Sequence, residues 1–275
     1  MTFKRLLIGC LLVASTWVYA APTTDDMVMA AKKDDPATIR EGLKAGFNPN
    51  YADRDGNTLL IHAAANMSPA AADALLQGGA DPTIRNKVGD DALNYAALKG
   101  NLPIVQSLVA RGVSVTRRQG WQPLTYAVFS KQLPVFNFLM DKGAEPNAVN
   151  PNHATALMFA AEQGQEAMVD RLLAAGADPT WTRNGESAVD WALKTQNTDI
   201  AEKIMKAQVE IGLTRSQALN EEETNEDESG SAESAVQTGL CLRATGNGGV
   251  GSSVPDSRST TGRSGVPQPD HTGAI

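Results

Sequence analysis

The side chains most often used for chemistry are few and scattered in this sequence. Its 275 residues include three histidines (His62, His153 and His271) and two cysteines, Cys10 and Cys241. A catalytic nucleophile needs a base to activate it, and a metal ion needs several ligands at suitable spacing. These five residues show no such spacing, and the sequence contains neither a G-x-S-x-G elbow nor a P-loop. We therefore predict that the protein is not an enzyme and uses neither a metal nor a cofactor.

Neighbouring carboxylates are the remaining candidates for chemistry. The pairs Asp25-Asp26 and Asp90-Asp91 could in principle act as general acids or as metal ligands. Aspartate also caps helices by accepting backbone N–H groups at the first turn. We interpret both pairs as helix caps and solvated turn residues, and His62 as a residue that braces a turn through hydrogen bonds.

The balance of charge restricts the possible partners. Twenty-four Lys and Arg against 31 Asp and Glu give a net charge of −7 and a pI of about 5.0. Binding to nucleic acid or to an anionic membrane surface requires clustered positive charge, so we expect neither. Apolar residues make up 42% of the chain but aromatic residues only 5%, which predicts a core of small aliphatic side chains.

The first residues have the pattern of an export signal. Two positive charges within the first five residues precede an apolar run over 6–18, and Val18-Tyr19-Ala20 provides small residues at a cleavage position. In a helix this run would span only about 20 Å, less than the roughly 30 Å of a bilayer core. We predict a signal peptide over 1–20, a mature chain that begins at Ala21, and a periplasmic or secreted protein without a membrane anchor.

A second interpretation of this region involves Cys10. The stretch Leu7-Ile8-Gly9-Cys10 resembles a bacterial lipoprotein box, in which the cysteine would be lipidated. Only three apolar residues precede Gly9, and the apolar sequence continues beyond Cys10. Cleavage after Ala20 is therefore the interpretation that we favour.

Two sets of residues recur with one period along the middle of the chain. The first set, with spacings of 33, 33, 31 and 33, is Gly46, Gly79, Gly112, Gly143 and Gly176. The second set, with spacings of 33, 31, 33 and 32, is Gly56, Gly89, Gly120, His153 and Gly185. Two independent markers with a common period near 33 indicate a repeat protein, in which neighbouring units stack to bury their apolar faces.

The repeated segments resemble a known family. The sequence Asp55-Gly56-Asn57-Thr58-Leu59-Leu60-Ile61-His62-Ala63-Ala64 is similar to the ankyrin signature D-G-x-T-P-L-H-x-A-A, and Leu75–Pro82 and Leu172–Pro179 resemble its ending L-L-x-x-G-A-D. The resemblance covers about residues 25–213. It implies an all-α ankyrin-repeat solenoid over 21–213, with finger loops, about five repeats and an N-terminal half-repeat.

Individual residues explain how each unit would fold. The side chains of Thr58, Asp91, Thr155 and Ser187 are expected to cap the first helix of their units. Prolines at the start of second helices, and the first set of glycines as left-handed residues at their ends, fit the same scheme.

The sequence also departs from the family pattern. The family's helix-initial histidine, which normally bonds to the threonine of the turn, is present only as His62; the equivalent positions hold Tyr95, Tyr126, Phe159 and Trp191. Gln122 replaces the capping threonine of its unit, and the linker from Gly112 to Gly120 is two residues short. We predict that the middle of the stack is its least regular part, and that the aromatic residues fill the space of the histidine without reproducing its hydrogen bonds in full.

The last part of the chain differs in composition. Six of the nine residues over 220–228 are acidic, and Gly, Ser and Thr dominate beyond them. Such a segment buries too little apolar surface to offset the entropy of ordering it. We predict that 214–275 is a disordered tail.

The ankyrin resemblance implies a concave binding surface made of finger tips and first helices. Its candidate protein-binding residues are Arg54, Asp55, Asn57, Lys87, Val88, Asp90, Lys99, Arg117, Arg118, Trp121, Phe129, Asn152, Glu162, Trp181, Arg183 and Glu186. Aromatic residues and arginine dominate binding hot spots, so Trp121 and Phe129 are the leading candidates for anchors. The alternative is that both residues fill the gap left by the short linker.

These observations predict a monomeric, non-enzymatic module that docks one folded protein and alters its activity. Exported bacterial ankyrin proteins, by resemblance, include immunity proteins against periplasmic toxins and accessory factors in peroxide defence. A secreted effector that binds host proteins is the alternative. Nothing in the residues identifies the partner.

Overall fold

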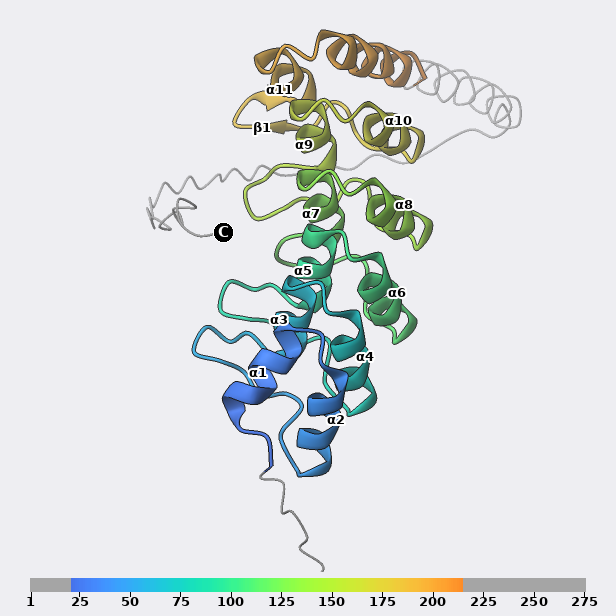
Figure 1. The fold of residues 1–275 in the computed structure, drawn as a ribbon. Helices are drawn as coiled ribbons and strands as arrows, with labels where there is room; N and C mark the ends of the chain where they lie inside the picture. The colour runs from blue at the N-terminus through green and yellow to red at the C-terminus, as the bar shows by residue number, and fades with distance from the viewer. Residues whose placement is uncertain (1–20, 215–275) are drawn as a thin grey trace, which may run out of the picture. The chain divides into compact units, whose positions relative to one another are not determined.

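The computed structural model describes residues 21–214, and within them the chain is an all-α solenoid of stacked helix pairs (Figure 1). The helices are α1 (Thr24–Lys32), α2 (Pro36–Lys44), α3 (Leu59–Ala65), α4 (Pro69–Gln77), α5 (Ala92–Lys99), α6 (Leu102–Ala110), α7 (Pro123–Phe129), α8 (Leu133–Asp141), α9 (Ala156–Glu162), α10 (Glu166–Ala174) and α11 (Ala188–Lys194). A final helix begins at 198 and continues to 214, the last described residue. The predicted signal peptide and almost all of the predicted tail lie outside the described residues.

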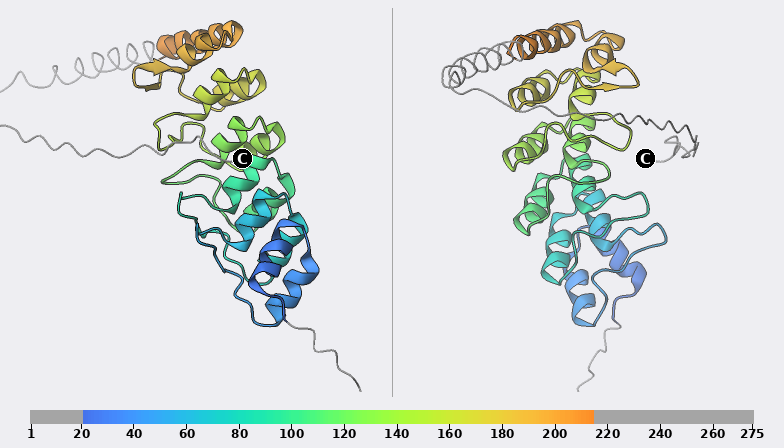
Figure 2. Two further views of the ribbon diagram at one scale, coloured as in Figure 1. Left: turned by 60° about the vertical axis from the view of Figure 1, so that its left-hand side comes forward. Right: turned by 180° about the vertical axis from the view of Figure 1, so that it is seen from behind.

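The helices form two layers. Each odd-numbered helix packs on the next odd-numbered one from α1 to α11, while α2, α4, α6 and α8 form a parallel second row. Loops project beyond the odd-numbered layer, away from the even-numbered helices, and the views of Figure 2 show the same arrangement. The last of these loops carries a two-residue hairpin in which β1 (Thr182–Arg183) pairs antiparallel with β2 (Glu186–Ser187).

Most of the predicted caps are present. The side chain of Thr58 accepts the N–H of Ile61, and the side chains of Asp91 and Ser187 likewise accept backbone N–H groups of α5 and α11. The prediction for Thr155 is wrong, because its side chain makes no cap hydrogen bond and its buried Oγ1 has no partner. In the loop before Thr155, the side chain of Asn150 accepts the backbone N–H of Gln122 from the previous unit.

The glycines that end the second helices have the predicted conformation. Their φ angles are +88° at Gly79, +85° at Gly112, +81° at Gly143 and +82° at Gly176. A Cβ atom at any of these four positions would meet nothing within 4 Å. The positive φ, and not crowding, is therefore the reason for glycine.

Small side chains allow the odd-numbered helices to approach closely. The alanine pairs Ala63-Ala64, Ala96-Ala97 and Ala160-Ala161 are completely buried between neighbouring helices. Larger residues such as Ile104 and Phe136 fill the space between the two layers. A core of this kind agrees with the low aromatic content of the sequence.

The final helix covers the last unit. Of the residues of this helix, Ile200 and Ile204 are buried, whereas Met205, Val209 and Leu213 remain exposed. No helix among the described residues is both long enough and apolar enough to cross a membrane.

Candidate protein-binding surface

Within residues 21–214, no group of three His, Cys, Asp or Glu side chains is placed to hold a metal ion. His62 contacts a single carboxylate: its Nε2 lies 2.9 Å from Oδ2 of Asp53. It therefore braces its finger loop, as predicted, but through Asp53 and not through the threonine of the turn. Burial lowers the pKa of His62, and the nearby Asp53 charge only partly opposes this effect.

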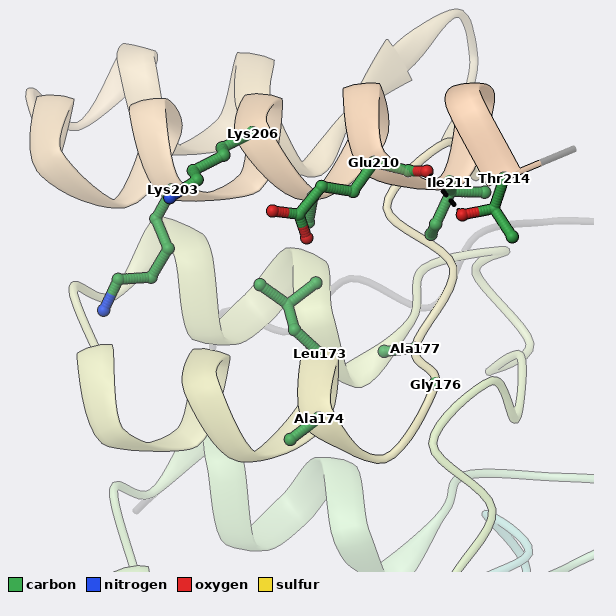
Figure 3. A pocket seen from close by; sticks show the side chains of 10 residues that line it. Leu173, Ala174, Gly176, Ala177, Lys203, Lys206, Glu210, Ile211 and Thr214 are labelled. Carbon is green, nitrogen blue, oxygen red and sulfur yellow. Dashed lines mark hydrogen bonds between the residues drawn. The ribbon is translucent and has the colours of Figure 1, made fainter. Parts of the chain in front are cut away.

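A cavity of about 790 Å³ lies between α10 and the final helix (Figure 3). Leu173 points between the two helices, and the lining combines apolar residues with the polar side chains of Lys203, Lys206, Glu210 and Thr214. The ammonium group of Lys203 is held by Glu166 at 2.9 Å and by Asp170 at 2.6 Å. With one lining carboxylate, Glu210, and no lining histidine or cysteine, this cavity has no pair of groups suited to acid–base or nucleophilic chemistry.

The loops beyond the odd-numbered helices provide a second candidate surface. We call the loops that lead from each even-numbered helix to the next odd-numbered one, with their finger tips at 53–57, 86–90, 117–121, 150–154 and 182–186, together with the adjoining ends of the odd-numbered helices, the finger face. Nine of the residues predicted to bind a partner are exposed here: Arg54, Asp55, Lys87, Val88, Lys99, Arg118, Phe129, Glu162 and Trp181. Partly buried are Asn57, Trp121, Asn152, Arg183 and Glu186.

Asp90 does not reach this surface. It is 8% exposed, its Oδ1 accepts the Asn94 side-chain amide at 2.7 Å, and its Oδ2 accepts the Tyr126 hydroxyl at 2.8 Å. Burial raises the pKa of Asp90, although both hydrogen bonds favour the charged form. Its position links the second finger to the helix of the next unit, so the prediction of Asp90 as a contact residue is not supported by its placement.

Tyrosines at the histidine position also form hydrogen bonds. Tyr126 bonds to Asp90, and the hydroxyl of Tyr95 accepts the Asn86 side-chain amide at 3.3 Å. Asn86 in turn donates to Asn57 at 2.9 Å. These hydrogen bonds connect neighbouring fingers, so the two tyrosines fill the space of the family's histidine and also contribute polar contacts of their own.

Arg117 is also turned inward. Its side chain is 8% exposed and forms an ion pair with Asp91, whose side chain is 1% exposed. The guanidinium also donates from Nη1 to the Ser114 carbonyl at 3.0 Å. Direct contact of most of this side chain with a partner is not compatible with such burial.

The third finger has a backbone arrangement of its own. In the first, second and fourth fingers, the N–H of Asp53, Asn86 or Asn150 donates to the backbone carbonyl four residues later. In the third finger, the N–H of Arg117 donates to the Gln122 side chain instead. Asn150 of the fourth finger supports this loop by accepting the N–H of Gln122 at 3.1 Å. This departure lies in the middle of the stack, where the sequence predicts irregularity, and the fifth finger differs as well because it forms the β1–β2 hairpin.

The two aromatic anchor candidates have different environments. The Trp121 ring is partly buried and lies 5.9 Å from the Tyr126 ring and 6.3 Å from the Phe159 ring. Phe129 is 56% exposed and meets Phe159 edge to face at 6.3 Å. Trp121 therefore serves packing between units, while Phe129 presents most of its ring to solvent.

Basic side chains recur at one position of the fingers. The residue two places before the finger glycine is Arg54, Lys87, Arg118 and Arg183 in four of the five loops. Arg183 lies 5.5 Å above the Trp191 ring, whereas the other three are exposed. Aligning the fingers on their glycines would have revealed this row from the sequence alone. Arg85 lies four residues before Gly89, outside the positions next to the finger glycine from which contact residues were predicted.

The chain belongs to the ankyrin-repeat family. The family model "Ankyrin repeats (3 copies)" matches residues 27–119, 65–150 and 124–215, which together span the described stack. Among solved structures, the human ASB11 ankyrin repeat domain superposes with a TM-score of 0.61 at 20% identity, covering 66% of this chain and 82% of that domain. The Bcl-3 ankyrin repeat domain gives a TM-score of 0.56 at 28% identity, covering 64% and 81%.

Curated relatives show the same similarity. The ankyrin repeat protein YahD of Escherichia coli (strain K12) is 28% identical over 193 residues, which cover 55% of this chain and 96% of YahD. The B-cell lymphoma 3 protein homolog of Mus musculus is 32% identical over 150 residues, covering 52% of this chain and 34% of that protein. Ankyrin repeats are protein–protein interaction modules, so the finger face is the natural place to seek a partner.

Proposed function

We propose that this protein is an exported, monomeric ankyrin scaffold that binds one folded protein on its finger face and changes that protein's activity without catalysing a reaction itself. The observation that carries the proposal is that Phe129 and the row of basic finger residues are exposed on the same finger face. An aromatic ring and arginines on a rigid frame are the usual components of a binding hot spot. A stacked scaffold also loses little conformational entropy when it binds.

Site-specific cross-linking tests this proposal. A photoreactive phenylalanine analogue is placed at Phe129 in the full chain, which is expressed in its native host. The control carries the analogue at Leu133, which is exposed on α8 of the same repeat but lies in the even-numbered layer. We expect a protein adduct from position 129 and a much weaker one from position 133. Equal adducts at both positions, or none, would contradict the proposal.

The location of the protein is a separate part of the proposal. Export follows from the pattern of residues 1–20, and the expected mature N-terminus is Ala21. Mass spectrometry of the periplasmic fraction measures that terminus, and a lipidated Cys10 would place the protein on a membrane instead. Recovery from the medium or from host cells, with none in the periplasm, would favour the effector role.

The two periplasmic roles differ in the partner's chemistry. An immunity protein would be cross-linked to a toxin, and an accessory factor in peroxide defence to a catalase or a related enzyme. Identification of the adduct by mass spectrometry distinguishes the two roles, and a neighbouring toxin or catalase gene would provide independent support.

A further inference from the structure

A second, basic pocket of about 520 Å³ lies on the finger face. It is lined by Arg85 of the second loop and by Ser114, Thr116, Arg117, Arg118 and Gln119 of the third. We call it the arginine pocket. It forms where the short linker between Gly112 and Gly120 brings three arginine residues of two units together, in a chain whose net charge is −7.

Two of these arginines are fixed in place. Nη1 of Arg85 donates to the Gln119 carbonyl at 3.2 Å, which joins the two loops. Arg117 is held by Asp91 and by the Ser114 carbonyl, but its buried Nε has no hydrogen-bond partner. Arg118 is exposed at the mouth, with no ion pair to a carboxylate within the described residues. The pocket therefore presents the positioned guanidinium of Arg85 together with the exposed one of Arg118.

The carboxylates near the pocket are already engaged. Asp91 pairs with Arg117 and caps α5, and Asp90 is bonded by Asn94 and Tyr126. Burial lowers the pKa of Arg117, Asp91 opposes this effect, and the positive charge of Arg85 adds to it. Three arginines against two carboxylates, Asp90 and Asp91, leave an excess of positive charge at the opening, which an incoming anion would offset.

The donors that remain free suit a carboxylate. The Ser114 hydroxyl donates to the Thr116 carbonyl at 2.8 Å, so its O–H is used within the loop, whereas the Thr116 hydroxyl only accepts the Glu145 N–H at 3.1 Å and keeps its own O–H. The Thr116 O–H and the planar guanidinium groups of Arg85 and Arg118 are left, and guanidinium groups match the two oxygens of a carboxylate. The same groups would also suit a phosphate, and the test below distinguishes the two anions.

We propose that the arginine pocket receives an aspartate or glutamate side chain from the protein that docks on the finger face, so that the partner is acidic at this point. This inference rests on the proposed function. The basic row at Arg54, Lys87 and Arg118 extends the same preference along neighbouring fingers. An acidic surface would be steered toward this row and held at the arginine pocket.

The direct test uses small probes and needs no knowledge of the partner. Nitrogen-15 NMR spectra of the full chain are recorded with acetyl-Gly-Glu-Gly-Glu-Gly-amide and with the isosteric glutamine peptide, at constant ionic strength. We expect saturable shifts at 85 and 114–119 with the glutamate peptide alone. Affinity should fall at least about fivefold in Arg118→Gln and in Arg85→Gln, and stay unchanged in Arg111→Gln, an exposed arginine outside the pocket. Unfolded variants are recognised in the same spectra.

Several results would overturn the inference. Equal binding of the glutamine peptide, or equal loss in Arg111→Gln, would show that the pocket does not read a carboxylate. Saturation by inorganic phosphate at lower concentration than by the glutamate peptide would make it a phosphate site instead.

Combining this test with cross-linking at Phe129 separates the two proposals. Peptide binding without an adduct would leave the pocket assigned and the docking function wrong. An adduct whose yield is unaffected by Arg118→Gln, in a chain that binds no peptide, would leave the docking function standing and remove the pocket from it.

Discussion

The side-chain amide of Gln122 pairs with the backbone amide of Arg117: Gln122 Oε1 accepts the Arg117 N–H at 2.9 Å, and Gln122 Nε2 donates to the Arg117 carbonyl at 3.0 Å. These two bonds close the third finger, whereas the first, second and fourth fingers are closed by a bond between two backbone groups. Gln122 occupies the helix-capping position of α7 but makes no cap bond. Its longer side chain thus compensates for a linker two residues short, and the arginine pocket lies beside this loop.

Loss of the Gln122 amide should be costly. The side chain is buried, with the residue 4% exposed, so Gln122→Ala strands the Arg117 N–H and carbonyl. We expect the free energy of unfolding to fall by about 2 kcal/mol, the scale of stranded buried polar groups. Urea denaturation of the full chain measures this change.

The matched control is Gln165→Ala. Gln165 also stands at a helix N-cap, that of α10, but its side chain makes no cap hydrogen bond. This variant should lose less than about 1 kcal/mol. Similar losses in the two variants would mean that the pairing with Arg117 contributes little.

The buried ion pair between Arg117 and Asp91 should show strong energetic coupling. Arg117→Met leaves the Asp91 charge buried and unpaired, for which a loss of about 3 kcal/mol is expected. Asp91→Asn removes the charge but keeps an oxygen that can cap α5. The double variant should therefore be more stable than the sum of the two single losses predicts, by at least about 1 kcal/mol. Strictly additive losses in denaturation would contradict a mutual role.

The family pattern predicted the stack well because its determinants are local. The positive-φ glycines, the prolines of the first turns and the alanine pairs each act within one unit, so their effect can be seen in sequence. The irregular third finger was also visible, as a short linker followed by Gln122.

Contacts between units were harder to foresee. Asp90 and Arg117 occupy finger positions that usually face solvent, yet each bonds to a residue of a neighbouring unit: Asp90 to Tyr126, 36 positions later, and Arg117 to Asp91, 26 positions earlier. Thr155 fails as a cap although its type and position fit. Such outcomes depend on which side chains of neighbouring units meet, and a repeat period does not specify that.

The stability of the first finger should depend on pH through His62. Burial lowers the pKa of His62 in the folded state below its usual 6.5, so the unfolded chain binds more protons between the two values. Its contribution to stability is present above about pH 6.5 and is lost as pH falls toward the folded pKa. Two charges act on it as well: the Asp53 carboxylate raises the pKa of His62 and the Lys32 ammonium group lowers it.

Thermal unfolding between about pH 7.5 and pH 5 measures this effect. The Tm of the wild-type chain should fall by several degrees more than that of His62→Tyr, a residue found at two equivalent positions of the stack. His153→Asn, which removes an exposed histidine at a left-handed position, is the control and should follow the wild type. Parallel curves for the wild type and His62→Tyr would show that burial of this imidazole has no energetic consequence.

Trp121 and Phe129 should separate packing from recognition. Both contact the Phe159 ring, but Trp121 is packed into the stack and Phe129 is mostly exposed. Trp121→Ala should lower the free energy of unfolding by about 2–3 kcal/mol, since it removes a partly buried aromatic side chain. Phe129→Ala should change it by less than about 1 kcal/mol.

For binding of the partner, we expect Phe129→Ala to have the larger effect and Trp121→Ala the smaller one. Cross-linking in the two variants, with the photoreactive group moved to the exposed Val88, measures recognition under conditions where both remain folded. We expect Phe129→Ala to reduce the adduct at least tenfold, because an exposed ring in a basic surface is available as an anchor. Trp121→Ala should reduce the adduct less, and only through any displacement of the third finger that loss of the ring causes. If Trp121→Ala leaves stability intact and removes the adduct, Trp121 is the anchor after all, and its contacts with Tyr126 and Phe159 must open when the partner docks.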